Sequence, residues 1–103
     1  MSDAEIEKEI QDKGLVAPRI TPDRIDEVVK AEDYHVFEGS ILTVCCLTLE
    51  NGFTVTGESA CASPENFNAA IGRKIAFDNA KRKIWPLEGY ALKQKLYETD
   101  SAR

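Results

Sequence analysis

The cysteines and the single histidine are the residues of this chain that could act as nucleophile, base or metal ligand. A catalytic pair would join Cys61 or Ser59 to His35, because a thiol or hydroxyl nucleophile needs a neighbouring base. Cys45 and Cys46 are adjacent, so in a strand they point to opposite faces and do not easily chelate one metal ion. The spacing to Cys61 fits no zinc pattern. The sequence therefore favours free thiols, with no metal, no cofactor, no catalytic residue and no enzyme activity.

Basic residues late in the chain are a second candidate for chemistry. Arg73 and Lys74 are followed by the run Lys81, Arg82 and Lys83. On a helix, such residues form a local anion site that would bind the phosphates of a nucleotide, or they form an ordinary solvated face. The solvated face is the more common arrangement.

A polar segment that begins at Glu58 and Ser59 joins a strand end to a helix start. The first N–H groups of a helix have no partner within the helix and can donate to an anion. We expect Ser63 and Glu65 to satisfy these groups themselves, so a helix cap is favoured over a ligand site. The speculative ligand-binding residues are Arg73, Lys74, Glu58, Ser59, Lys81 and Arg82.

Composition and charge exclude several classes of protein. The chain has 103 residues, 43% of them hydrophobic and 30% charged, which fits one globular domain. Its formal net charge of −5 gives no strong case for nucleic-acid binding. The charge is uneven, because residues 1–50 carry 12 acidic and 5 basic side chains. No apolar run is long enough to span a membrane, and residues 1–11 lack the apolar core of a signal peptide, so a cytoplasmic location is expected.

Residues 43–57 carry the clearest structural signal. β-branched and aromatic residues flank Asn51-Gly52, a pair typical of a hairpin turn. A two-residue turn would mix apolar and polar side chains on both faces. A three-residue loop with Gly52 in the left-handed region separates them, as a half-buried sheet requires. The pairs that we predict are Leu49 with Phe53, Leu47 with Val55 and Cys45 with Gly57.

Two helices are predicted before the hairpin. The first begins with a capping box at Ser2, continues to about Asp12 and ends at Gly14. It carries a thin apolar stripe of two isoleucines, so it needs a body or a partner to pack against. A linker follows over residues 15–20. The second helix begins at Thr21, with a proline at its first position, and ends near Glu32.

Two further helices are predicted after the hairpin. The longest begins with Ser63 as its cap and continues to about Trp85, where Pro86 stops it. Apolar residues at helical spacing give it a broad inner side. Gly72 lies within this helix and is predicted to mark a close approach to the sheet. A last helix reaches about Glu98.

These elements predict an α+β fold. A central antiparallel hairpin, open to a third strand over residues 34–37, packs against the long helix, with flanking N- and C-terminal helices. We expect residues 1–20 to form an N-terminal helix and linker, and residues 21–103 to form a single α+β domain.

Six segments, in order along nearly the whole chain, resemble the phage gene-product 49/66 family of small proteins. The resemblance implies an origin in a tailed phage or prophage and an intracellular protein. It brings no established activity and no catalytic residues. The segments are 14–19, 47–53, 57–61, 63–67, 71–76 and 84–90.

Two functions of different classes follow from these observations. The first is a non-enzymatic phage accessory protein that binds a host protein or assembles with itself. A small core often gains stability by oligomerising, so we expect a homodimer to which residues 1–20 contribute contacts. The second is a binder that sequesters a nucleotide signal of host defence, using the basic residues named above. A third reading, a small enzyme, has the least support.

Overall fold

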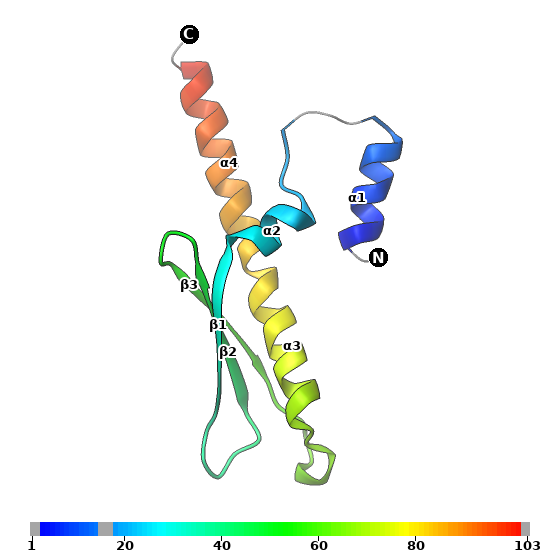
Figure 1. Cartoon of the computed structure of the whole chain (residues 1–103), viewed down its shortest axis with the longest axis vertical. Coiled ribbons are helices and arrows are strands. Elements are labelled where there is room, and N and C mark those ends of the chain that lie inside the picture. The colour runs from blue at the N-terminus through cyan, green and yellow to red at the C-terminus, as the bar shows by residue number, and fades with distance from the viewer. Residues whose placement is uncertain (1–2, 15–17, 102–103) are drawn as a thin grey trace. The chain divides into compact units, whose positions relative to one another are not determined.

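The computed structural model describes residues 3–14 and 18–101. The chain divides into two compact units, one made of Met1–Glu27 with Trp85–Arg103 and the other of Val28–Ile84. Figure 1 labels the elements. In chain order they are α1 (Asp3–Asp12), α2 (Pro22–Val28), β1 (Val29–Val36), β2 (Thr43–Leu49), β3 (Thr54–Ser59), a short 3-10 turn (Pro64–Asn66), α3 (Ala69–Arg82) and α4 (Ile84–Ser101).

A three-stranded antiparallel sheet with one covered face forms the second unit. The strand order is β1-β2-β3, and α3 packs on β2 and β3 (Figure 1). The predicted α+β fold with a hairpin packed against a helix is therefore confirmed, and the sheet has the third strand. Among the described residues, no helix is long and apolar enough to cross a membrane.

The hairpin has the predicted register. Leu47 is paired with Val55, and the Leu49 N–H donates to the Phe53 carbonyl at 2.8 Å, which closes a three-residue loop. Gly52 has φ of +89°, in the left-handed region that favours glycine. Along β2 the side chains alternate between buried and half-buried, starting with buried Thr43. The apolar face therefore points to α3, as a one-sided sheet requires.

Strand β1 is longer than predicted, and α2 is shorter. The helix ends at Val28, and the strand begins at Val29 instead of near Tyr34. Two adjacent valines favour an extended backbone, and pairing with β2 outweighs the helical spacing of the preceding apolar residues. The register shifts between Val29 and Ala31, so a bulge lies at the start of β1.

Helix α3 begins later than predicted. Its N-cap is Asn68, whose side-chain oxygen accepts a hydrogen bond from the Ile71 N–H at 3.0 Å. The prediction that Ser63 caps this helix was wrong. Ser63 is extended and donates its hydroxyl to the Glu65 carboxylate, which lowers the pKa of Glu65. The proline that follows Ser63 begins only the 3-10 turn. Helix α3 begins after Asn68 instead, because the Asn68 side chain makes the capping hydrogen bond.

Pro86 does not stop a helix. Helix α3 ends at Arg82, and α4 begins at Ile84, with Lys83 between them. Pro86 therefore lies in the first turn of α4, where a missing N–H costs little because that group has no acceptor within the helix. The last helix consequently begins earlier than predicted and extends to Ser101.

Small residues let α3 approach the sheet closely. Ala76 and Ala80 are fully buried on its inner side. A Cβ on Gly72 would lie 3.1 Å from the Thr43 hydroxyl, so the predicted close approach at this glycine is present. The tightest contact is at Gly57 of β3, where a Cβ would lie 2.2 Å from the Ala80 backbone nitrogen. Only glycine fits at that position.

The first unit contains α1, α2 and α4. Thr21 caps α2, since its hydroxyl accepts from the Arg24 N–H at 3.2 Å. The Arg24 Nε donates to Glu88 Oε2 at 3.1 Å and so ties α2 to α4. Gly14 has φ of +67° just after α1, which agrees with the predicted helix end. The cap predicted at Ser2 and the first part of the predicted linker, residues 15–17, lie outside the described residues.

Candidate functional site

The predicted ligand-binding residues of α3 do not all share one side of the helix, although Lys74 and Lys81 are seven residues apart and do. Helical spacing places Arg73 on the flank toward β1, and Arg82 on the flank toward β3. Lys74 is exposed on the outward side. Lys81 lies with its Nζ 5.9 Å from the centre of the Phe77 ring, in a cation–π contact. A single phosphate would therefore not meet these side chains together in this arrangement.

Glu58 and Arg82 are brought near one another through Asn79. The Asn79 side-chain N–H donates to the Glu58 carbonyl at 2.9 Å, and its oxygen accepts from Arg82 Nη1 at 3.4 Å. The Glu58 carboxylate accepts from the Thr56 hydroxyl at 3.5 Å. Ser59 is half-buried at the end of β3. This cluster fastens α3 to the edge of β3 and uses polar groups that a ligand would otherwise contact.

Arg73 belongs to a second cluster that sequence reasoning missed. It lies near Tyr34 of β1, which is paired with Cys45 of β2. Burial and the neighbouring Cys45 and Glu32 raise the pKa of Tyr34 to about 12, and Arg73 partly opposes them. Burial also raises the pKa of Cys45. A buried, protonated thiol is a poor nucleophile, so this pair is structural.

The nucleophile and base considered for catalysis make separate contacts. The His35 ring packs edge-on against Phe37, with ring centres 4.5 Å apart. The Cys61 thiol donates to the Ser63 carbonyl at 3.2 Å. Cys45, Cys46 and Cys61 are all free thiols. Within residues 3–14 and 18–101, no group of three or more His, Cys, Asp or Glu is placed to hold a metal ion.

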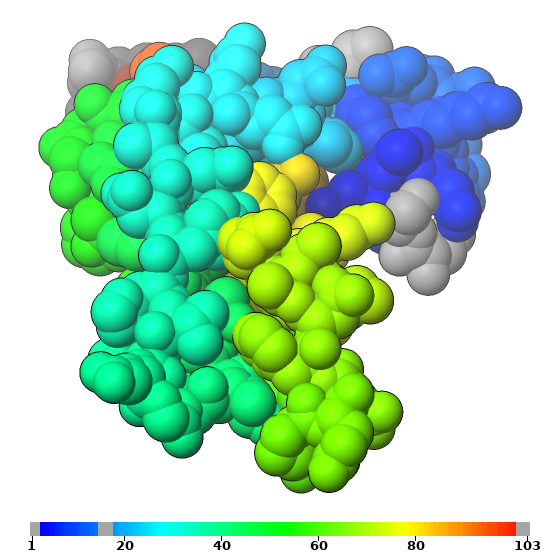
Figure 2. Space-filling model, turned by 60° about the horizontal axis from the view of Figure 1, so that its bottom comes forward, coloured from blue at the N-terminus to red at the C-terminus, as the bar shows by residue number. Residues whose placement is uncertain are grey.

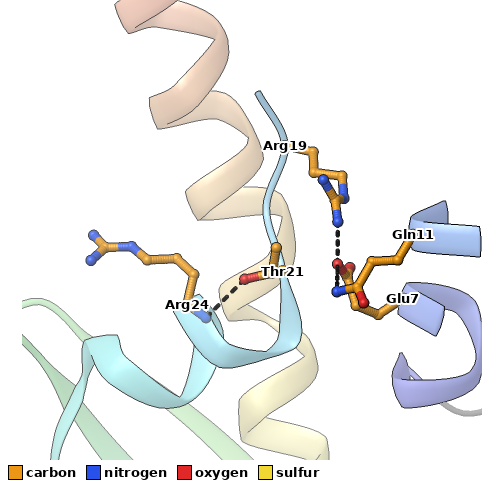
Figure 3. Close-up of polar contacts among 5 residues, drawn as sticks. All are labelled: Glu7, Gln11, Arg19, Thr21 and Arg24. Carbon is orange, nitrogen blue, oxygen red and sulfur yellow. Dashed lines mark hydrogen bonds and ion pairs between the residues drawn. The ribbon is translucent and has the colours of Figure 1, made fainter. Parts of the chain in front are cut away.

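A hollow of about 260 Å³ opens in the first unit. The two isoleucines of the α1 stripe form one side of it, and Trp85 of α4 forms another. The Arg19 guanidinium pairs with the Glu7 carboxylate and so holds the segment before α2 to α1 (Figure 3). Within α1, the same carboxylate also accepts from the Gln11 side chain at 3.2 Å. The lining residues are Asp3, Ile6, Glu7, Ile10, Ile20, Pro22 and Trp85.

The lining of this hollow decides which ligands it suits. Its walls are apolar, and its charged groups are the carboxylates of Asp3 and Glu7. Such a lining suits an apolar or cationic group and repels a phosphate. The volume lies just below the range of about 300–1,000 Å³ that is typical of ligand pockets. The stripe of Ile6 and Ile10 indicated a surface that packs against something, but the sequence did not indicate that Trp85 would share its hollow.

Helix α4 carries exposed large apolar side chains, most of them on one side. Helical spacing places Leu92 and Leu96 on the side that also carries Trp85, and Leu87, Tyr90 and Tyr97 on roughly the opposite side. Tyr90 is 72% exposed and Tyr97 is 62% exposed. We call Leu87, Tyr90 and Tyr97 the α4 seam. A helix with apolar residues on two sides is typical of a helix that packs between two bodies.

The comparisons with known proteins agree with the resemblance seen in the sequence. The model of the phage protein (N4 Gp49/phage Sf6 gene 66) family matches residues 20–96, well over half of the chain. No curated protein and no solved structure matches the chain significantly. The matched residues include most of the described elements, from α2 to most of α4. The chain therefore belongs to the phage protein (N4 Gp49/phage Sf6 gene 66) family.

Proposed function

We propose that this chain is a cytoplasmic phage accessory protein that acts by binding another protein, either a host protein or a second copy of itself. The observation that carries the proposal is the α4 seam. Tyr90 and Tyr97 lie about two turns apart on the same side, and Leu87 precedes Tyr90 by about one turn. Steps of three and seven residues, as from Leu87 to Tyr90 and from Tyr90 to Tyr97, are among those by which a helix docks in an apolar groove.

The residue types of the seam support binding to protein. Tyrosine is enriched among the residues that dominate binding energy, because its ring buries a large area and its hydroxyl keeps a polar partner. Isolated exposed apolar residues are ordinary on a surface, but an aligned set on one helix is characteristic of an interaction site.

The homodimer expected from the sequence is part of the proposal. Its first interface candidate is α1, where Ile6 is 43% exposed. Ile6 and Ile10 also line the hollow within their own unit, which supports the alternative that α1 packs on its own chain. Removal of residues 1–20 separates the two, because a dimer held by α1 dissociates and a dimer held elsewhere persists.

The alternative function is sequestration of a nucleotide signal by Arg73, Lys74, Lys81 and Arg82. Its support is the presence of these basic residues on one helix. The hollow of the first unit does not favour it, since that lining is apolar and acidic. Release of a nucleotide from the purified, denatured protein would favour this alternative over protein binding.

The test compares a seam variant with a matched surface variant. Tyr90→Ala with Tyr97→Ala removes both rings, and Lys93→Ala with Lys95→Ala changes two other exposed residues of the same helix. Sedimentation velocity of each purified chain, and of each chain mixed with host lysate, measures association. In lysate, we expect the tyrosine variant to lose the species formed with host protein and the lysine variant to keep them. Equal association with lysate protein by both variants would contradict the use of the seam.

A further inference from the structure

Strand β1 is an edge strand of the sheet, and some of its backbone N–H and C=O groups are not paired with another strand. The Leu49 N–H donates to the Phe53 carbonyl, and the Leu49 carbonyl accepts from the Gly52 N–H. Leu49 and every second residue before it in β2 therefore form their hydrogen bonds with β3, and the residues between them form theirs with β1. The partners of those other residues on β1 are Ala31, Asp33 and His35. The N–H and C=O groups of the β1 residues that alternate with these three therefore point away from β2, where no other described strand pairs with them. These residues are Glu32, Tyr34 and Val36.

The two edges of the sheet differ. On β3 the outward carbonyl of Glu58 accepts from the side chain of Asn79, so α3 closes part of that edge. Strand β1 has no such cap among the described residues. Six of its eight residues are exposed, and β1 lies open at the surface in Figure 2. An open edge of this length is a template for another strand.

We propose that β1 pairs with β1 of a second copy, antiparallel about a two-fold axis at Tyr34. The pairing joins the two sheets into one continuous sheet, with the α3 helices of both copies on the same face. It rests on the homodimer of the proposed function and names its interface. It needs neither the α4 seam nor residues 1–20.

Hydrogen-bond complementarity selects this register. With Tyr34 opposite Tyr34 of the second copy, Asp33 lies opposite His35 of the second copy, and the two-fold axis repeats that pair. An imidazole N–H donates to a carboxylate at the short distance of a non-hydrogen-bonded pair. Phe37, 49% exposed, lies opposite the small Ala31 of the second copy. The Phe37 ring also holds the His35 ring from the side, which fixes its position before pairing.

The neighbouring registers place like residues together. A shift of two residues in one direction sets Asp33 opposite Asp33 of the second copy. A shift in the other direction sets His35 opposite His35 and Glu32 opposite Glu38. Like charges directly opposite each other destabilise a strand pair. Charged residues on an edge often serve to prevent pairing, but here one register converts them into complementary pairs.

The length of the interface follows from the bounds of the strand. The bulge at Val29 and Ala31 limits the edge on one side, and the turn at Gly39 limits it on the other. Residues 32, 34 and 36 of both copies then form three hydrogen-bonded pairs, or about six backbone hydrogen bonds. The strand is already formed, so the pairing costs little ordering of the chain.

Charge reversals test the register in homodimers of a single variant. Asp33→Lys places lysine opposite histidine, and His35→Glu places glutamate opposite aspartate, twice in each dimer. We expect each single variant to raise the dissociation constant of the dimer at least about tenfold. The double variant Asp33→Lys with His35→Glu places opposite charges across the pair and should recover most of the affinity. Asp78→Lys, an equal charge change on the exposed side of α3, is the control and should have no effect.

A mixing experiment tests the same register between chains. In a mixture of the two single variants, the side chain introduced by Asp33→Lys in one chain lies opposite the side chain introduced by His35→Glu in the other, and the native pair forms at the second site. Native mass spectrometry with one chain isotope-labelled should show the mixed dimer in excess over both homodimers. Circular dichroism of each variant confirms that the strand is retained.

The outcomes separate the two proposals. A wild-type chain that sediments as a monomer at high micromolar concentration overturns the homodimer and this interface together. A wild-type dimer that resists both single reversals, or a statistical mixture of dimers, overturns only the β1 pairing. A dimer that survives removal of residues 1–20, weakens with each reversal and recovers in the mixture supports the β1 pairing.

Discussion

Gly57 of β3 and Ala80 of α3 meet backbone to backbone. A Cβ added to Gly57 would lie 2.2 Å from the Ala80 nitrogen and 2.3 Å from the Ala76 carbonyl oxygen. Both distances are far shorter than any van der Waals contact, and neither atom belongs to a side chain that could rotate away. The missing side chain at position 57 thus sets the distance between the helix and the sheet.

Gly57→Ala should lower the free energy of unfolding by about 3 kcal/mol or more, because α3 must move away from β2 and β3. Gly89→Ala is the matched control. It lies in α4 with open space around its position, so the same change should leave stability equal or raise it by about 1 kcal/mol. Urea denaturation of both variants measures the difference. Equal effects would show that the close approach is not essential.

Gly52→Val should destabilise the chain by roughly 1–2 kcal/mol, since a β-branched residue is strained at the positive φ of the hairpin loop. Gly52→Asn provides the comparison, because asparagine tolerates the left-handed region. We expect thermal unfolding to place asparagine between glycine and valine. Identical midpoints for all three residues would count against the three-residue loop.

Thr43→Val should stabilise the chain by about 1 kcal/mol. The Thr43 hydroxyl is fully buried and has no hydrogen-bond partner among the residues that the structure describes. Valine has nearly the same shape and carries no polar atom that must lose its hydration. Thr48→Val, on the half-buried outer face of the same strand, should change stability much less. A loss of stability in the first variant would indicate a polar partner for the hydroxyl.

Stability should fall on the alkaline side because of Tyr34. Burial raises its pKa from 10.0 to about 12, so the folded chain holds the phenolic proton more tightly than the unfolded chain does. This contribution is complete below pH 10 and is lost as the pH rises through about 12. The raised pKa of Cys45 acts in the same direction.

Tyr34→Phe removes the phenolic contribution and keeps that of Cys45. Between about pH 9 and pH 11.5, chemical denaturation should show a smaller loss of stability for this variant than for the wild type. Equal losses would mean that the Tyr34 proton is held no more tightly in the folded chain.

The hairpin could be predicted because its evidence is local. The alternation of Leu47, Leu49 and Val55 around Asn51-Gly52 determines the turn, the register and the covered face. The boundaries at the junctions could not be predicted in the same way. Val29 leaves the helical pattern because β2 offers a strand partner, and that partner is distant in sequence. Pro86 looked like a helix stop because the sequence does not show where the next helix begins.

The candidate interfaces were less predictable than the fold. The open edge of β1 depends on which backbone groups face away from β2, and that follows from register, not from residue type. The proximity of Arg73 to Tyr34 likewise depends on how α3 lies over the sheet. Basic residues close in sequence, such as Arg73 and Lys74, separate to different sides once the helix forms.

Native mass spectrometry of the full chain, purified from host lysate without denaturation, tests most directly whether this protein acts by associating with protein. The spectrum would report oligomer, bound protein and bound metabolite together. We predict the mass of two chains, or of the chain with a host protein. A single chain at high micromolar concentration, either alone or carrying only a small metabolite, would contradict this.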